Sequence, residues 1–168
     1  MLLAGWNLAV VEWRLANDAM IEAQQARRSG RHEVAASHET RAAILLESAI
    51  DHIDVARRLG PRSAELECVA ANIYASAAAK LGGRTDPEAA AQEEDLLEKA
   101  WMSCQVAVEL HMPPVRLKEL PVLAPRLGQD PRFQKLLKQA PAATKPIPAN
   151  LLVDMFPDIR DRLMVIQP

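Results

Sequence analysis

Four histidines and two cysteines are the residues of this chain best suited to bind a metal or to act as a base or a nucleophile. They are His32, His38, His52, His111, Cys68 and Cys104. No histidine has the Glu-x-x-His or His-x-x-x-His relation of a metal-binding helix, and the cysteines lack the spacing of metal ligands. We therefore expect solvated or capping histidines and two buried thiols in a reducing compartment, with no metal site and no cofactor.

Acidic residues recur in short runs at 51–54, 65–67 and 93–98. Carboxylates near the start of a helix interact favourably with its dipole, so these runs indicate exposed helix faces rather than catalytic acids. The chain has no glycine-rich phosphate loop, no Gly-x-Ser-x-Gly elbow and no set of kinase motifs. The expectation is a protein without catalytic residues, that is, not an enzyme.

The composition favours a single all-α domain. The chain has 168 residues, of which 49% are hydrophobic and only 4% aromatic, and 29 are alanine. Alanine is the best helix former, whereas sheets are enriched in aromatic and β-branched residues. A net charge of -2 gives no electrostatic reason to bind nucleic acid or an anionic membrane. Glu12 and Arg14 interrupt the apolar N-terminus, so we expect no membrane span and a cytoplasmic protein.

Proline and charge divide the chain near residue 112. Ten of the twelve prolines lie at or after Pro113, while 24 of the 29 alanines precede it. Caps and stop signals, such as Ser63 and Gly30, predict four helices in the first part, at about 2–27, 33–59, 63–81 and 86–111. Their short loops imply two antiparallel hairpins. We predict a cap at 113–139 and, at 140–168, a proline-rich linker with an apolar segment that docks on the body or binds another molecule.

The second and fourth helices share a pattern of apolar residues 51 positions apart. Leu46, Ala49, Ile53 and Ala56 in the second helix match Leu97, Ala100, Cys104 and Ala107 in the fourth. Each helix is followed by a proline, at Pro61 and Pro113. Matching spacing at this period indicates an internal repeat.

On these residues the chain resembles the tetratricopeptide-repeat family. Leu46, Ala49, Ile53, Ala56 and Pro61 fit the second half of its motif, and the next helix has Ala71 and Tyr74 where the family has glycine and tyrosine. The first helix fits less well, since Glu12 stands at the tyrosine position. The resemblance covers roughly residues 2–112 and implies hairpins stacked as a short solenoid.

Residues 117–137 resemble the run that closes repeat arrays in some bacterial proteins, often beside a serine/threonine kinase. A cap is physically reasonable because a solenoid must cover the apolar face of its last helix. One alternative is therefore a non-catalytic regulatory fragment of a larger kinase-like protein. Another is a helical bundle that uses Cys68 and Cys104 for thiol or metal chemistry.

The family resemblance implies a scaffold that binds a peptide or a partner helix in a concave groove. By register, the groove is lined by Trp6, Val10, Trp13 and Asn17 from the first helix and by Cys68, Asn72 and Ala75 from the third. The tryptophans are either groove anchors or core residues. The first helix has no cap before it, so we expect it to pack on a second copy (a homodimer), on a partner protein or on an upstream repeat.

Overall fold

The computed structural model describes residues 2–82, 86–120 and 122–139. Every regular element in these ranges is a helix, which confirms the all-α prediction. The helices are α1 (Leu2–Arg28), α2 (His32–Leu59), α3 (Ala64–Leu81), α4 (Pro87–Glu109), α5 (Val115–Lys118), α6 (Leu123–Leu127) and α7 (Pro131–Leu137). The four long helices begin and end within two residues of the predicted bounds. The linker and apolar segment predicted at 140–168 lie outside the described residues.

Local capping chemistry explains where the helices begin and end. The side-chain oxygens of Ser63, Asp86 and Asp130 accept hydrogen bonds from backbone N–H groups of the first turn of α3, α4 and α7, at 3.1, 2.7 and 2.8 Å. Gly30 ends α1 with a φ of 75°, a conformation that glycine adopts without strain. His111 takes the equivalent position after α4 with a φ of 72°.

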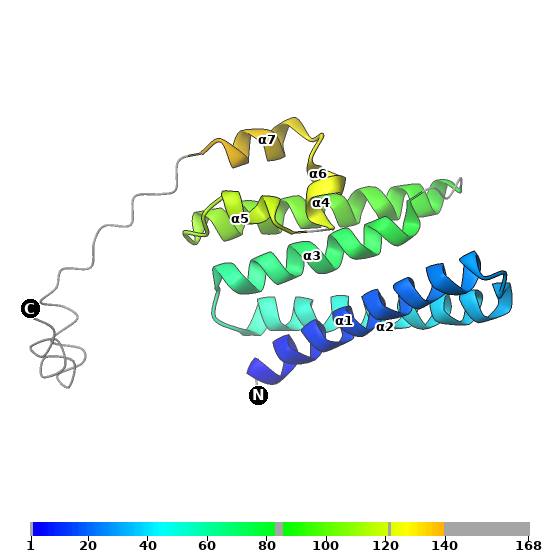
Figure 1. Cartoon of the computed structure of the whole chain (residues 1–168). Helices are drawn as coiled ribbons and strands as arrows, with labels where there is room; N and C mark the ends of the chain where they lie inside the picture. Colours follow the sequence, from blue (N-terminus) through cyan, green and yellow to red (C-terminus); the bar gives the residue numbers. More distant parts are fainter. Residues whose placement is uncertain (1, 83–85, 121, 140–168) are drawn as a thin grey trace, which may run out of the picture.

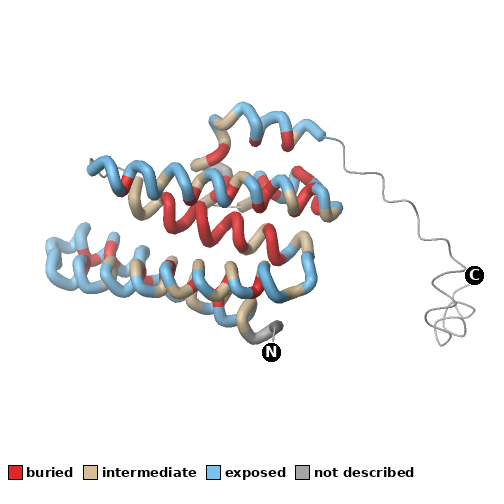
Figure 2. Tube along the Cα trace, turned by 180° about the vertical axis from the view of Figure 1, so that it is seen from behind, coloured by how far each residue is buried: buried red, intermediate tan, exposed pale blue. Residues whose placement is uncertain are grey.

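The helices stack as two hairpins and a cap (Figure 1). The α1 helix packs on α2, α3 packs on α4, and α2 lies against α3, which joins the hairpins. The α6 helix contacts both α3 and α4, and α7 lies on the side of the stack opposite α1 and α2. The α3 helix is buried along most of its length (Figure 2). The core is therefore centred on α3.

Small side chains let the helices of the first hairpin approach closely. The buried positions of α1 are Ala9, Ala16, Ala19, Ala23 and Ala26, and those of α2 include Ala35, Ala42, Ala49 and Ala56. With only methyl groups between them, two helix axes can approach to the short end of the usual packing distance. The alanine content of the sequence thus sets the spacing within the hairpin.

The two halves of the predicted repeat occupy similar surroundings. Both members are buried at three pairs of matched positions: Ala49 and Ala100, Ile53 and Cys104, and Ala56 and Ala107. The fourth pair differs, because Leu46 is buried while Leu97 is half-buried and its neighbour Leu96 takes the buried place in α4. Pro61 is exposed just beyond the end of α2.

A chain of polar side chains joins the hairpins where α2 meets α3. Arg57 of α2 contacts Glu67 of α3 at 2.9 Å and donates a second hydrogen bond to the Tyr74 hydroxyl at 3.0 Å. The Tyr74 hydroxyl in turn donates to Asp54. Tyr74 and Ala71, one turn apart in α3, are fully buried, and the Glu67 side chain is 5% exposed. Arg57 is therefore the group that neutralises a carboxylate buried between the hairpins.

The protonation states of this network follow from its surroundings. Burial, together with the hydrogen bond to Asp54, raises the pKa of Tyr74 above its usual value, so the phenol keeps its proton and donates. Burial opposes the charge on Arg57, but the hydrogen bond to Glu67 and the neighbouring Tyr74 raise its pKa overall. Arg57 therefore stays charged and Tyr74 stays protonated at neutral pH.

The cap is attached to the second hairpin by two arginines. Arg126 of α6 pairs with Glu93 at 3.0 Å and donates to the carbonyl of Ala79 near the end of α3, also at 3.0 Å. A Cβ at residue 82 would lie 2.7 Å from the Arg126 guanidinium, so Gly82 leaves the room that this contact needs. The arginine thus satisfies one of the carbonyls that the end of α3 leaves unpaired.

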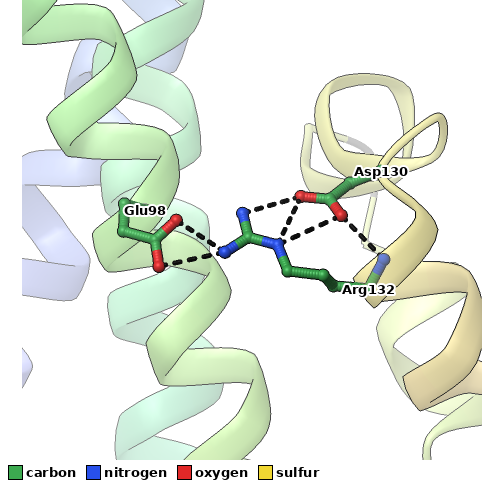
Figure 3. Close-up of polar contacts among 3 residues, drawn as sticks. All are labelled: Glu98, Asp130 and Arg132. Carbon is green, nitrogen blue, oxygen red and sulfur yellow. Dashed lines mark hydrogen bonds and ion pairs between the residues drawn. The ribbon is translucent and has the colours of Figure 1, made fainter.

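Arg132 makes the corresponding contact from α7 (Figure 3). Its guanidinium binds Asp130 of the same segment and Glu98 of α4, both at 2.9 Å. It also lies 5.1 Å from the centre of the Trp101 ring. The hydrogen bond from Arg132 lowers the pKa of Asp130. These groups are largely exposed, so they orient α7 more than they stabilise it.

Replacing Arg57 by alanine should lower the free energy of unfolding by about 2–3 kcal/mol, because it leaves the Glu67 carboxylate buried without its counterion. Urea denaturation followed by circular dichroism measures the change. Arg58→Ala is the matched control: this arginine is exposed, and its loss should change the stability by less than about 0.5 kcal/mol. Equal effects of the two substitutions would contradict the role given to Arg57.

Candidate functional site

The four residues predicted to line a groove from α1 share one face of that helix. Trp6, Val10, Trp13 and Asn17 follow the three- and four-residue spacing of a helical stripe, and all four are half-buried. The indole Nε1–H of Trp13 donates a hydrogen bond to the Ser76 hydroxyl of α3 at 2.9 Å. This face of α1 therefore points toward the second hairpin.

The residues predicted from α3 lie deeper than those from α1. Cys68 is half-buried, Asn72 retains 5% of its surface and Ala75 has none exposed. The Oδ1 atom of Asn72 has no hydrogen-bond partner among the described residues. Because Trp13 reaches across to Ser76, the first half of the α1–α3 interface is closed, and Asn72 and Ala75 are covered in this structure.

The interface opens toward the ends of α1 and α3. A hollow of about 740 Å³ lies there, next to the start of α2. It is lined by Met20, Arg27, Ala36, Glu39, Thr40, Ala43, Ala79, Lys80 and Gly82. Trp13 of α1 bonds to Ser76 of α3. Further along both helices, Met20 and Ala79 line the same hollow, so α1 and α3 run in the same direction. The open site is thus one to two turns beyond the predicted centre.

A second hollow of about 380 Å³ adjoins the first along the last turns of α1. Met20, Arg27 and Glu39 line both hollows, and together the two define the end groove. Met20 is partly exposed at the centre of this end groove. A flexible thioether at that place can adapt to partners of different shape.

Charged groups form the rim of the end groove. Arg27 pairs with Glu39 at 2.7 Å, which links α1 to α2. The Lys80 ammonium donates to the backbone carbonyl of Glu39 at 2.9 Å, which links α3 to the same point. The end groove therefore combines Met20 and three alanines (Ala36, Ala43 and Ala79), here called the floor, with charged and polar side chains. A mixed lining of this kind is found at protein-binding surfaces.

The structure also brings together Glu12, Ser48 and His52, which the sequence did not connect. The Ser48 hydroxyl donates to Glu12 at 2.8 Å, and the His52 Nδ1 lies 2.7 Å from the other Glu12 oxygen. A hydrolytic triad uses one imidazole nitrogen for the acid and the other for the nucleophile. Here Nδ1 is the nitrogen near both groups, so the cluster serves to hold α1 on α2. The only sequence signal was Glu12 at a position where the repeat family has tyrosine.

Neither cysteine has the character of a reactive thiol. Burial raises the pKa of Cys104. Burial also raises the pKa of Cys68, although the nearby Arg116 guanidinium offsets part of that effect. Since the thiolate is the nucleophile, both shifts make the thiols less reactive at neutral pH.

The described residues form neither a metal-binding cluster nor a membrane-spanning helix. Within residues 2–82, 86–120 and 122–139, no group of three or more histidine, cysteine, aspartate or glutamate side chains is arranged to hold a metal ion. Over the same part of the chain, none of the helices combines the length and the apolar character needed to cross a lipid bilayer.

The raised thiol pKa values predict slow modification of the folded chain. Near pH 8, Ellman's reagent should react with Cys68 at least ~10-fold more slowly than with free cysteine, and more slowly still with Cys104. Cys68→Ser and Cys104→Ser isolate each thiol, and denaturation in urea should make both fast. A thiol that reacts at the free rate in the folded protein would support the thiol chemistry considered above.

The comparisons with known proteins do not assign the chain to a family. A scan against protein-family models gave no match. Searches among curated proteins and among solved structures likewise gave none. The resemblance to tetratricopeptide repeats therefore stays a prediction from the sequence, and the function has to be argued from the geometry.

Proposed function

We propose that this chain is a non-catalytic, protein-binding scaffold, built as a short tetratricopeptide-like stack, that holds a peptide or a partner helix in the end groove. The observation that carries the proposal is the open hollow at the ends of α1 and α3, centred on Met20. The partner is a protein segment rather than nucleic acid, because acidic residues outnumber basic ones in the body of the chain.

The direction of the helices supports the stacked arrangement. In a repeat stack, the first helix of each hairpin runs parallel to the first helix of the next, and the two line a common concave face. Trp13 bonds to Ser76 at an offset of 63 residues. This is close to the 62-residue offset between Glu12 and Tyr74, which stand at the family's tyrosine position in the first and third helices. The contact between α1 and α3 is thus in the register expected for consecutive repeats.

The closed and open halves of this interface have different roles in the proposal. Trp6 and Trp13 pack against the core, so they close this part of the interface. Met20 and the small residues of the floor, Ala36, Ala43 and Ala79, leave room for the side chain of a partner. Affinity then comes from burial of an apolar anchor on Met20, at roughly 25 cal/mol for each Å² of apolar surface removed from water.

A peptide selected from a display library against the full chain provides the test. Its affinity, measured by calorimetry, should fall at least ~10-fold when Met20 is replaced by glutamate, because the charge would be buried beneath the anchor. Met20 is partly exposed in the unbound chain, so the fold should be unaffected.

Met102→Glu is the matched control. Met102 is an exposed methionine on α4 and does not line either hollow of the end groove, so its substitution should leave the affinity unchanged. Selected peptides that bind both variants as tightly as the unmodified chain would show that the end groove is not the binding site.

A further inference from the structure

The first hairpin exposes aliphatic side chains on the side that faces away from the second hairpin. The six residues, here called the outer face, are Leu8, Val11 and Leu15 of α1 and Ile44, Val55 and Leu59 of α2. Between 38% and 62% of each residue remains accessible. Six large aliphatic residues on one hairpin are more than scattered surface hydrophobics, and such patches mark interaction sites.

Helical geometry places these residues opposite the second hairpin. Residues two positions apart in a helix lie about 200° apart around its axis. Val11 and Leu15 flank Trp13, which bonds to α3. Val55 and Leu59 flank Arg57, which also bonds to α3. The outer face therefore points out from the end of the stack that α1 and α2 form in Figure 1.

The two ends of the stack differ. At the far end, α6 and α7 cover the second hairpin, held there by Arg126 and Arg132. Copies of the chain cannot add head to tail onto an end that is already capped. The self-association that remains pairs one outer face with another, and such an isologous contact closes as a dimer.

The whole side of the hairpin that carries the outer face is large enough for a stable dimer. Helices of 27 and 28 residues are each about 40 Å long, at about 1.5 Å for each residue. Two such helices side by side, each about 10 Å wide, present about 800 Å². That area is what each partner contributes to an interface of standard size.

To reach this face, the apolar run near the C-terminus has to cross the whole stack. The last described residue, Gln139, follows α7 at the opposite end of the stack. The apolar run begins at Leu151, and a fully extended chain of that length spans at most about 40 Å. The route around three layers of helices, each roughly 10 Å thick, uses most of that length.

Charges on the outer face suggest how two copies align. Glu12 of α1 contacts Ser48 of α2, and Glu22 contacts His38. Residue 18 of α1 therefore lies at nearly the same position along the hairpin axis as residues 41–44 of α2. Asp18 and Arg41 are exposed, and neither has a hydrogen bond or an ion pair with any other described residue. A two-fold axis along the hairpin lays α1 of one copy on α2 of the other and brings Asp18 beside the second copy's Arg41.

We propose that the chain forms a homodimer through the outer face, with α1 of each copy packed on α2 of the other and Asp18 paired with Arg41 across the interface. The proposal is independent of the end groove, because the outer face and the α3-facing residues lie on opposite sides of α1. It assigns a second copy of this chain to the place where an upstream repeat or a polar cap would otherwise stand.

Sedimentation equilibrium of the full chain between about 1 and about 100 µM tests the proposal. The unmodified chain should sediment as a dimer. Val11→Glu combined with Val55→Glu should weaken the dimer at least ~100-fold, because four carboxylates would meet in the interface. Met102→Glu combined with Val115→Glu is the control, since both residues are at least as exposed as Val11 and Val55 but lie outside the outer face, and this variant should stay dimeric.

Charge exchange then tests the alignment. Asp18→Arg and Arg41→Asp should each weaken the dimer, and the double variant should restore it, with circular dichroism showing that all three are folded. A chain that is monomeric at about 100 µM overturns the proposal, and so does a dimer that survives the double glutamate substitution. Failure of the double exchange to restore the dimer would overturn the pairing of Asp18 with Arg41.

Discussion

The contact between α2 and α3 is the constraint on which the rest of the molecule depends. Each hairpin has an internal interface of small residues. Among the described residues, the two hairpins meet mainly through α2 and α3, with a smaller contact between α1 and α3. Arg57 lies at the end of the α2–α3 contact nearest the loop between these two helices, bound to Glu67 and Tyr74 of the other hairpin. A cation held by a buried carboxylate and a buried phenol has one satisfactory geometry, so the network fixes the angle between the hairpins as well as their distance.

That angle decides which surfaces remain open. It brings Trp13 onto Ser76 and so closes the first part of the α1–α3 interface, while the longer first hairpin extends past the end of α3 and leaves the end groove. It also leaves the opposite side of α1 and α2 without a cover. The proposed peptide site and the proposed dimer interface are thus two consequences of one packing arrangement, on opposite sides of the same helix.

The helices were predictable because local chemistry sets where they begin and end, whereas the contacts between the hairpins were not predictable. Ser63 and Gly30 act through their own backbone neighbours, so the sequence was sufficient to locate the helix ends. The 51-residue pattern also anticipated which faces of α2 and α4 are buried. The burial of Asn72 and Ala75 depends on how closely α1 lies on α3, where Trp13 bonds to Ser76, and hence on the inter-hairpin angle. No periodicity encodes that angle, and the predicted groove centre was therefore a turn or two away from the open site.

Methyl NMR of alanine-labelled chain, titrated with a selected peptide, tests the scaffold proposal most directly, because alanines are distributed over every face of the body. We expect the largest shift changes at Ala36, Ala43 and Ala79, which line the end groove, and no change at Ala91 on α4, which lies outside it. Shift changes centred on α4, or spread evenly over both hairpins, would contradict the proposed binding site.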